Sequence, residues 1–565
     1  MKNKLSNLLL IPSSVAMMLL MSDGELKYCL AAIVLGLVIG TVLSLIRENQ
    51  SNVMNKTERL VSFLLAILFC FVLSNVFYKT WINHPYKMKE LVELVVPNYK
   101  LGLRIISLII AITAVPAAAF FFSLFVPDIM RSVREELFKD FSVTSFLKRG
   151  TVVVLCLVLS ALLGYVMLIG SYLIPVGPIE ENVRRSAYTV QAEGTFPTLT
   201  RWATSDLDNY TDAIMLLEAA AERQVSASVD SMNVPHGIID GKDYVEIMVD
   251  HYLNGEDFDG QFQYARYWHG YLIWLKPLLT VLEYSQIRTV NGMLQIFMIA
   301  MLCLLLVKRG LRGSVIPVLL SYMMLMPFAL AKSFQFSSCF YACILGGIVL
   351  LSAEKKKYKT GPFIVFLFIG IFTAYFDFLT YPIATFGVPA LIWLMITRSE
   401  RTEKKYADML VNGFCWSLGY LGMWTEKWIM ASILTENDII QNAIRAVRER
   451  TGTVSLEGGA YYGVLSCEAE NYLAFFRTPV TVLAVGFAAY IILKYVRRIK
   501  AEPEKTMQTV LPFVLVGLLP AVWYTLTLNH STNHFWFTNK ACVVSFLAAL
   551  LCLACLAEDG QPGED

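Results

Sequence analysis

Residues 150–174 read GTVVVLCLVLSALLGYVMLIGSYLI, an unbroken run without a charged side chain. An α-helix rises about 1.5 Å per residue, so a helix of this length crosses a hydrocarbon core of about 30 Å. A helix also satisfies its own backbone hydrogen bonds, which lipid cannot do. The run therefore predicts a membrane-spanning helix.

Similar runs recur along the chain, and the composition agrees with them. Of the 565 residues, 56% are hydrophobic and 16% are charged, whereas soluble proteins carry about 25% charged residues. Because the runs are solidly apolar rather than alternating, they favour helices over transmembrane strands. We expect an all-α, polytopic transmembrane bundle of about fourteen spans. The predicted spans are 7–22, 26–46, 59–78, 102–126, 150–174, 288–307, 313–331, 335–353, 361–376, 380–397, 408–427, 479–495, 508–528 and 538–557.

Basic residues in the connecting segments orient these spans. They all fall on one side of the membrane when the spans alternate, and by the positive-inside rule that side is cytoplasmic. Both termini are then cytoplasmic in a multi-pass protein of the cell membrane, and the 435–478 loop is external. The basic residues and segments that set this orientation are Lys2, Lys4, Arg47, Lys56, Arg59, Arg131–Arg149, Lys308, Arg309, Arg312, Lys355–Lys359, Arg398–Lys405 and Lys494–Lys500.

One long stretch, residues 176–287, does not fit a bilayer and is expected to form an external loop. It separates a five-span scaffold (1–175) from a nine-span region (288–565). Within the loop, the segments Asp206–Glu222 and Tyr264–Tyr284 mix apolar and polar side chains. Such a mixture predicts helices that lie on the bilayer surface.

The same loop carries the acidic sequence Ser205-Asp206-Leu207-Asp208-Asn209-Tyr210-Thr211-Asp212. On a helix, Asp208 and Asp212 stack four residues apart on one face. Carboxylates held near a membrane surface favour a reaction site, because acids act as general bases. The alternative is structural, since acids at a helix start cap free N–H groups and meet the positive end of the helix dipole.

Further polar residues are predicted at the same external level. Asp377 lies between two spans with almost no loop, which is costly for an acid unless it is paired or used. Lys427 and its neighbour Glu426 are either functional or a pair that reaches from the end of a span to water. We expect Asp208, Asp377, Lys427 and His530 to line one pocket.

A multi-span chain whose long external loop carries an acidic motif, followed by surface-lying helices and further spans, resembles the GT-C glycosyltransferases. The resemblance covers roughly residues 150–565 and is architectural, without a signature string. It implies an integral membrane enzyme that moves a sugar from a polyprenyl-phosphate carrier to a glycan or lipid acceptor on the outer face. In that family an acid in or near the first external loop is the base, and Asp208 is the best match, followed by Asp206. The additional N-terminal spans depart from the family pattern, as does the lack of an acidic doublet at the loop start other than Glu180-Glu181.

An inverting transfer needs a carboxylate that takes the proton of the acceptor hydroxyl and cations that hold the departing phosphate. The predicted catalytic acids are Asp208, Asp206 and Asp377. The predicted substrate-binding residues are Asp212, Arg266, His269, Lys276, Lys427, His530 and His534. Among them the arginine and the lysines supply positive charge for the phosphate, and arginine suits bidentate binding.

No metal site is predicted. The histidines and cysteines match no zinc signature, although His530 and His534 lie four residues apart. Asp206-Leu207-Asp208 has the Asp-x-Asp form that binds metal in nucleotide-sugar enzymes, but no nucleotide donor exists outside the cell. A divalent cation is compatible with the sequence and not required by it. With a net charge of +2 and no basic tract with interleaved aromatics, nucleic acid is not an expected partner.

Two other functions stay open. A polymerase or ligase acting on lipid-linked polysaccharide would also have two large external loops, with Arg445, Arg448 and Arg450 on the lipid pyrophosphate. A transporter is the alternative that is not an enzyme. It predicts broken or polar mid-span segments in paired halves, and the sequence contains no internal repeat.

Overall fold

The computed structural model describes residues 134–139, 142–353, 362–435, 437–452, 463–501 and 503–558. The predicted spans 7–22, 26–46, 59–78 and 102–126 lie outside the described residues. The chain forms two compact units, and each is described by itself. The large unit comprises Phe141–Arg448, Glu470–Trp523 and Asn533–Asp565, and the small unit comprises Met1–Asp140, Glu449–Ala469 and Tyr524–Thr532.

The described part is predominantly helical, as predicted, and several helices match predicted spans. Five helices are long and apolar enough to cross a membrane: Val143–Tyr172, Tyr284–Lys308, Phe334–Ser352, Gln508–Leu526 and Phe535–Ala557. A sixth is added if two helices joined at a bend of 85° count as one span. The described part therefore supports five or six spans in a membrane protein, and a total of about fourteen stays a prediction.

The helices outside the polar loop carry most of the apolar sequence. Their long, leucine- and valine-rich runs favour helices because each run satisfies its backbone internally. They are α7 (Val143–Tyr172), α13 (Tyr284–Lys308), η3 (Arg312–Ser314), α14 (Val315–Met324), α15 (Pro327–Lys332), α16 (Phe334–Ser352), α17 (Phe363–Phe376), α18 (Ile383–Ile396), α19 (Thr402–Leu434), α20 (Ile439–Arg450), α21 (Val464–Phe476), α22 (Pro479–Ala501), α23 (Pro503–Gly517), α24 (Leu519–Leu526), α25 (Leu528–Asn533), α26 (Phe535–Thr538), η5 (Asn539–Cys542) and α27 (Val543–Glu558).

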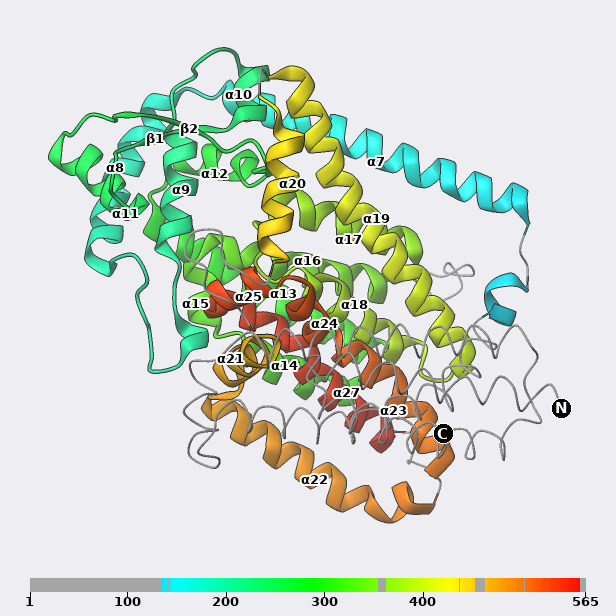
Figure 1. Ribbon diagram of the computed structural model, residues 1–565. Coiled ribbons are helices and arrows are strands. Elements are labelled where there is room, and N and C mark those ends of the chain that lie inside the picture. The colour runs from blue at the N-terminus through cyan, green and yellow to red at the C-terminus, as the bar shows by residue number, and fades with distance from the viewer. Residues whose placement is uncertain are drawn as a thin grey trace, which may run out of the picture. The chain divides into compact units, whose positions relative to one another are not determined.

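The loop predicted at 176–287 folds into a lobe of short helices with one antiparallel strand pair, which Figure 1 shows gathered together. We call residues 176–283 the lobe. Its elements are α8 (Val176–Glu193), η1 (Ala203–Ser205), α9 (Asn209–Ala220), α10 (Ala227–Asn233), β1 (Pro235–Ile238), α11 (Tyr244–Val249), η2 (Asp250–Asn254), β2 (Gly260–Gln263) and α12 (Leu272–Leu279). β1 and β2 pair so that His236 lies opposite Phe262.

Local sequence signals begin the short helices of the lobe. The Asp243 carboxylate accepts from the backbone of Glu246, whose side chain accepts from the Asp243 N–H, forming a capping box at the start of α11. Ser226 caps α10 by accepting from the Val229 N–H at 3.3 Å. These caps satisfy N–H groups that a short helix would otherwise leave unpaired.

The prediction that Asp206–Glu222 lies on the bilayer surface is wrong for α9. Every residue of this helix from Asp212 to Ala220 is buried, with α8, α11, α12, α16 and β1 packed around it. A helix on a bilayer needs one face open to lipid. The polar residues of α9 instead find partners inside the protein, so the helix is a central element of the lobe.

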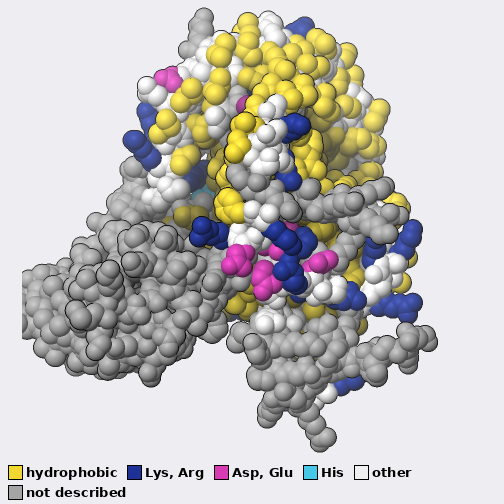
Figure 2. Space-filling model, turned by 90° about the vertical axis from the view of Figure 1, so that its right-hand side faces the viewer, with side chains coloured by type: hydrophobic (Ala, Val, Ile, Leu, Met, Phe, Trp, Pro, Cys, Tyr) yellow, Lys and Arg dark blue, Asp and Glu magenta, His cyan; other side chains and the backbone are white. Residues whose placement is uncertain are grey.

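Outside the lobe, the helices expose large apolar side chains that a soluble protein would bury. On α7 alone they include Leu155, Leu159, Leu163 and Val166. Figure 2 shows one face of the molecule, where hydrophobic side chains cover a broad area and charged side chains gather in a band. This distribution fits helices surrounded by lipid.

Candidate functional site

The acids near the start of α9 are held by a backbone pairing between residues 195–199 and 205–209. The Leu207 N–H donates to the Pro197 carbonyl at 2.9 Å, and the Asn209 N–H donates to the Thr195 carbonyl at 3.0 Å. The turn between these strands is closed by the Ser205 hydroxyl, which accepts from the Thr200 N–H at 3.0 Å. The acidic sequence is thus extended and fixed up to Asp208, and only then becomes helical.

Asp208 is the N-cap of α9. Its Oδ1 accepts from the Thr211 N–H at 2.9 Å, and its Oδ2 accepts from the Trp536 indole N–H at 3.3 Å. The side chain is buried, and burial raises the pKa of the Asp208 carboxyl, while these donors partly oppose the rise. Both carboxylate oxygens are therefore engaged, and the structural alternative proposed from the sequence holds for this residue.

Asp206 has a different surrounding, although it is only two residues away. It is half-buried, and its Oδ1 is a buried atom without a hydrogen-bond partner among the described residues. Burial raises the pKa of Asp206, and a hydrogen bond from Thr198 and the charge of Lys540 partly oppose the rise. Asp206 therefore keeps an oxygen that is able to accept a proton.

Lys540 is the basic residue next to these acids. It is fully buried in η5, donates to the Thr204 carbonyl at 2.8 Å, and lies 4.5 Å from the centre of the Phe336 ring. The sequence prediction missed this residue because it falls inside the predicted span 538–557. It is the only charged residue of that span, and a lone charge inside an apolar span is itself a signal of function.

Aromatic faces surround the acids. Trp536, which donates to Asp208, lies 5.3 Å from the Phe196 ring, and Phe196 stacks on Tyr210 at 6.1 Å. The predicted substrate-binding residue His534 joins the same group, since its ring lies 5.4 Å from Trp536. Phe196 is 51% exposed, so this group is accessible. We call Asp206, Asp208, Lys540, Trp536 and Phe196 the acid site.

Asp212 does not face the acid site as a free acid. Its carboxylate accepts from the Phe334 N–H at 3.0 Å, at the start of α16, and from the Tyr284 hydroxyl at 2.5 Å. Arg288 in turn donates to Tyr284 at 2.6 Å and to Glu193 at 2.8 Å. Asp212 is fully buried. These contacts give it a structural role that ties the lobe to the membrane helices, in place of the predicted contact with substrate.

A second polar group lies around Glu218, at the other end of α9. The Tyr271 hydroxyl donates to Glu218 Oε2. His269 Nδ1 lies 3.1 Å from the same oxygen, and His236 Nδ1 lies 3.7 Å from Oε1. We call Glu218, His236, His269 and Tyr271 the Glu218 cluster. All four side chains are buried, so the cluster is a polar core of the lobe.

The geometry at His269 fixes where its ring proton lies. Nε2 is 2.7 Å from the Tyr264 carbonyl oxygen, which can only accept, so Nε2 carries a proton. Nδ1 faces the Tyr271 hydroxyl at 2.8 Å. The backbone of His269 has φ of 55°, a left-handed conformation that is uncommon for a residue other than glycine. His269 is therefore a buried residue that holds a strained turn by its hydrogen bonds.

The cations predicted to bind phosphate lie away from the acid site. Lys276 is buried against the Tyr172 ring at 4.4 Å, and burial lowers its pKa to about 8, partly opposed by Glu218. Lys427 donates to the Met232 carbonyl at 2.9 Å. Arg266 donates to Asn442 at 3.1 Å. Lys276 and Lys427 surround the Glu218 cluster, and Arg266 joins the lobe to α20.

Asp377 closes the turn between α17 and α18. Its Oδ2 accepts from the Thr380 N–H at 3.0 Å, and the Thr380 hydroxyl donates to Oδ1. The next residue, Phe378, packs its ring 5.1 Å from His269. The structure therefore places Asp377 beside the Glu218 cluster, so that Asp208 and Asp377 belong to two different groups. His530 is buried in the small unit.

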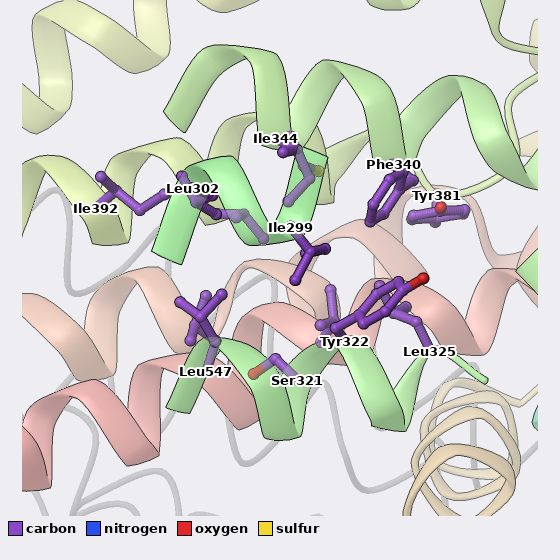
Figure 3. Close-up of a pocket in the computed structure, with 14 residues that line it drawn as sticks. Ile299, Leu302, Ser321, Tyr322, Leu325, Phe340, Ile344, Tyr381, Ile392 and Leu547 are labelled. Carbon is purple, nitrogen blue, oxygen red and sulfur yellow. The ribbon is translucent and has the colours of Figure 1, made fainter. Parts of the chain in front are cut away.

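An apolar pocket lies among the membrane helices of the large unit (Figure 3). Its walls come from α13, α14, α16, α18 and α27, with Tyr381 at one end. The Tyr381 hydroxyl donates to the Phe336 carbonyl at 2.6 Å, and Phe336 is the residue under Lys540. The first turn of α16 therefore connects this pocket with the acid site.

Comparison with protein-family models, curated proteins and solved structures finds no match to this chain. Within the described ranges, no group of three or more His, Cys, Asp or Glu residues is placed to hold a metal ion. Function is therefore argued from the geometry and chemistry of the acid site.

Proposed function

We propose that this chain is a membrane glycosyltransferase that moves a sugar from a polyprenyl-phosphate carrier to a glycan or lipid acceptor on the external face. The observation that carries the proposal is the acid site. It combines a half-buried carboxylate with a free oxygen, a buried lysine and accessible aromatic faces, all at the ends of two candidate membrane spans. A lipid-linked donor presents its sugar at this level.

Asp206 is the base in this proposal. It takes the proton of the acceptor hydroxyl while the acceptor oxygen bonds to the anomeric carbon, and the bond from that carbon to the phosphate oxygen breaks. A base needs a free lone pair, and Oδ1 of Asp206 has one. Because this oxygen is buried, the proposal requires that binding of the acceptor opens a path to it. Asp208, the better match to the family pattern, has both oxygens engaged. It acts by holding Trp536 and the start of α9 in place.

Lys540 holds the phosphate that leaves with the bonding electrons. An ammonium group has three N–H donors, and the hydrogen bond to the Thr204 carbonyl uses one of them. In a dry site a fixed positive charge stabilises developing negative charge far more than it does in water. Its place near the start of the last candidate span supports this role, because a lipid-linked phosphate lies near the end of a membrane span.

The aromatic parts of the site fit the sugar of the donor. Phe196 and Trp536 offer aromatic faces, on which the apolar face of a sugar ring stacks. The apolar pocket beyond Phe336 has a volume of about 30 Å³, far below the ~300–1,000 Å³ of ligand pockets. In this proposal the prenyl chain therefore lies in the surrounding lipid.

The test replaces each acid by its amide. Asp206→Asn is expected to lose transfer by about 10²–10⁴-fold, the typical contribution of a general base, and to keep normal expression and insertion. Asp208→Asn keeps the cap on α9, since asparagine caps a helix as well as aspartate does, but it loses the acceptor for the Trp536 indole. Its loss of transfer is expected to be much smaller than that of Asp206→Asn. Asp257→Asn is the matched control at an exposed acid of the lobe. Transfer is measured in membranes with polyprenyl-phosphate-linked hexoses and pentoses.

The results distinguish an error in the identity of the base from an error in the proposed activity. Normal transfer by Asp206→Asn with loss in Asp208→Asn would return the base to Asp208. A native chain that is inactive with every donor of the set would contradict the transferase itself.

A further inference from the structure

Helix α20 carries three stripes along its length. Ile439 and Ala443 are buried and pack it against the protein. A second stripe is apolar and exposed, with Ile440 at 41%, Ile444 at 44% and Val447 at 44% exposure. Residues spaced by four and three positions share one side of a helix, so these three side chains form a continuous apolar strip.

The third stripe is polar and basic, and it lies beside the apolar one. Gln441, Arg445 and Arg448 follow the same spacing one residue further along the chain, and all three are exposed. One residue corresponds to about 100° around a helix. The arginines therefore point to one flank of the apolar strip, and their aliphatic stems are able to lie along it.

The short connection to α19 keeps the start of α20 close to the end of that helix. α20 begins after a short link from the end of α19, from which it turns away sharply (Figure 1). The outer part of α19 is itself apolar and exposed, with Ile433 at 75%. The start of α20 is fixed to the lobe by Arg266, which donates to Asn442 at 3.1 Å. The Asp438 carboxylate caps the helix by accepting from the Gln441 N–H at 3.0 Å. Residues 435–438 alone separate the exposed apolar end of α19 from the exposed strip of α20.

We propose that α20 lies in the headgroup region of the outer leaflet and binds anionic phospholipid. Ile440, Ile444 and Val447 enter the boundary between headgroups and acyl chains, and Arg445 and Arg448 reach to phosphate groups. A helix with an apolar strip and a basic flank binds a bilayer surface in two ways. The apolar side chains are buried among the lipids, and the basic side chains are attracted to anionic headgroups. The basic flank and the exposed apolar end of α19, only four residues before α20 in the chain, favour lipid over a protein partner. This inference does not rest on the proposed function.

The test places a polarity-sensitive fluorophore on introduced cysteines in the full chain in nanodiscs. Ile444→Cys and Ile440→Cys report on the strip, and Val225→Cys is the control at an exposed apolar residue of the lobe. The native chain, labelled in the same way, gives the background from its 11 cysteines. We expect labels at 444 and 440 to emit at shorter wavelength than the label at 225, and to be quenched by lipid that carries a shallow nitroxide.

The arginines are tested by changing both lipid and protein. Adding phosphatidylglycerol to phosphatidylcholine discs is expected to increase the quenching at 444, and the pair Arg445→Gln and Arg448→Gln is expected to remove that increase. A label at 444 that iodide in the water quenches as strongly as the label at 225 would overturn the proposal. Protection of the label from both quenchers would also overturn it, because it would indicate a protein partner or a second copy.

Discussion

Three aspartates of one short segment have three different roles because their surroundings differ. Asp208 accepts from a helix N–H and an indole, and Asp212 accepts from another helix and a tyrosine. Only Asp206 has a buried oxygen without a partner among the described residues. A carboxylate whose lone pairs are occupied is a poor base. The choice between these acids therefore depends on their hydrogen bonds, which the sequence does not show.

The titration of Asp206 predicts how the rate of sugar transfer depends on pH. Burial raises the pKa of Asp206 above its ordinary value of about 3.9. A base works only when deprotonated, so transfer is expected to fall as the pH drops through this raised pKa. The measurement is the rate of transfer at saturating acceptor across the acidic range, for the native chain and for Asp206→Asn.

The variant provides the control for the pH profile. The small residual activity of Asp206→Asn should lack the acidic limb, since an amide does not titrate there. The same limb in both proteins would assign it to another group and would argue against Asp206 as the base.

At the scale of elements, α17 and α19 pack along much of their length because two glycines face the opposite backbone. A Cβ atom at Gly370 would lie 2.2 Å from the Trp416 carbonyl oxygen, and one at Gly419 would lie 2.2 Å from the Leu367 carbonyl oxygen. Small residues let helices approach closely in membranes, where dispersion and not the hydrophobic effect drives association. α19 carries Lys427 and Met423, which contact the lobe. This close pair therefore also positions the lobe.

We predict that Gly370→Ala and Gly419→Ala each destabilise the fold by about 1–3 kcal/mol, the usual cost of overpacking. The matched control is Gly486→Ala, where an added Cβ meets no atom within 4 Å. There alanine should be neutral or stabilising by about 0.5–1 kcal/mol, because it favours the helix. Unfolding of the purified variants in detergent, followed by circular dichroism, measures the difference. Equal stability of all three variants would contradict the close packing.

At the scale of the whole molecule, the lobe lies between two candidate spans in the chain. α7 crosses before it and α13 crosses after it, so Gly177 and Arg309 are expected on opposite sides of the membrane. By the positive-inside rule the basic residues near Arg309 predict that this end is cytoplasmic. On that topology the acid site is expected outside, where the proposed lipid-linked donor would present its sugar.

Reporter fusions test this topology. Fusions after Gly177 and Thr435 are expected to report an external position, and fusions after Arg309, Lys356 and Arg497 a cytoplasmic one. Each position is tested with two separate fusions, one to alkaline phosphatase and one to a fluorescent protein, so that the two reporters assign its side of the membrane independently. A cytoplasmic reading at Gly177 together with an external one at Arg309 would invert the chain and end the transferase proposal.

The sequence by itself determined the helical membrane class and the approximate positions of several helices in the described apolar part. In lipid, a long uncharged run satisfies its backbone hydrogen bonds only as a helix. The predicted spans 150–174 and 335–353 accordingly correspond to α7 and α16. It also pointed to the acidic segment, because charge is conspicuous in an apolar chain.

Only the tertiary structure decided which polar residues meet. In the folded chain α9 is buried, and Asp212 accepts a hydrogen bond from the start of α16. His269 lies next to Glu218. It brought Lys540 to the acids from the far end of the chain. The physical reason is that a buried polar group is defined by its partners, and these come from elements hundreds of residues apart that no local pattern connects.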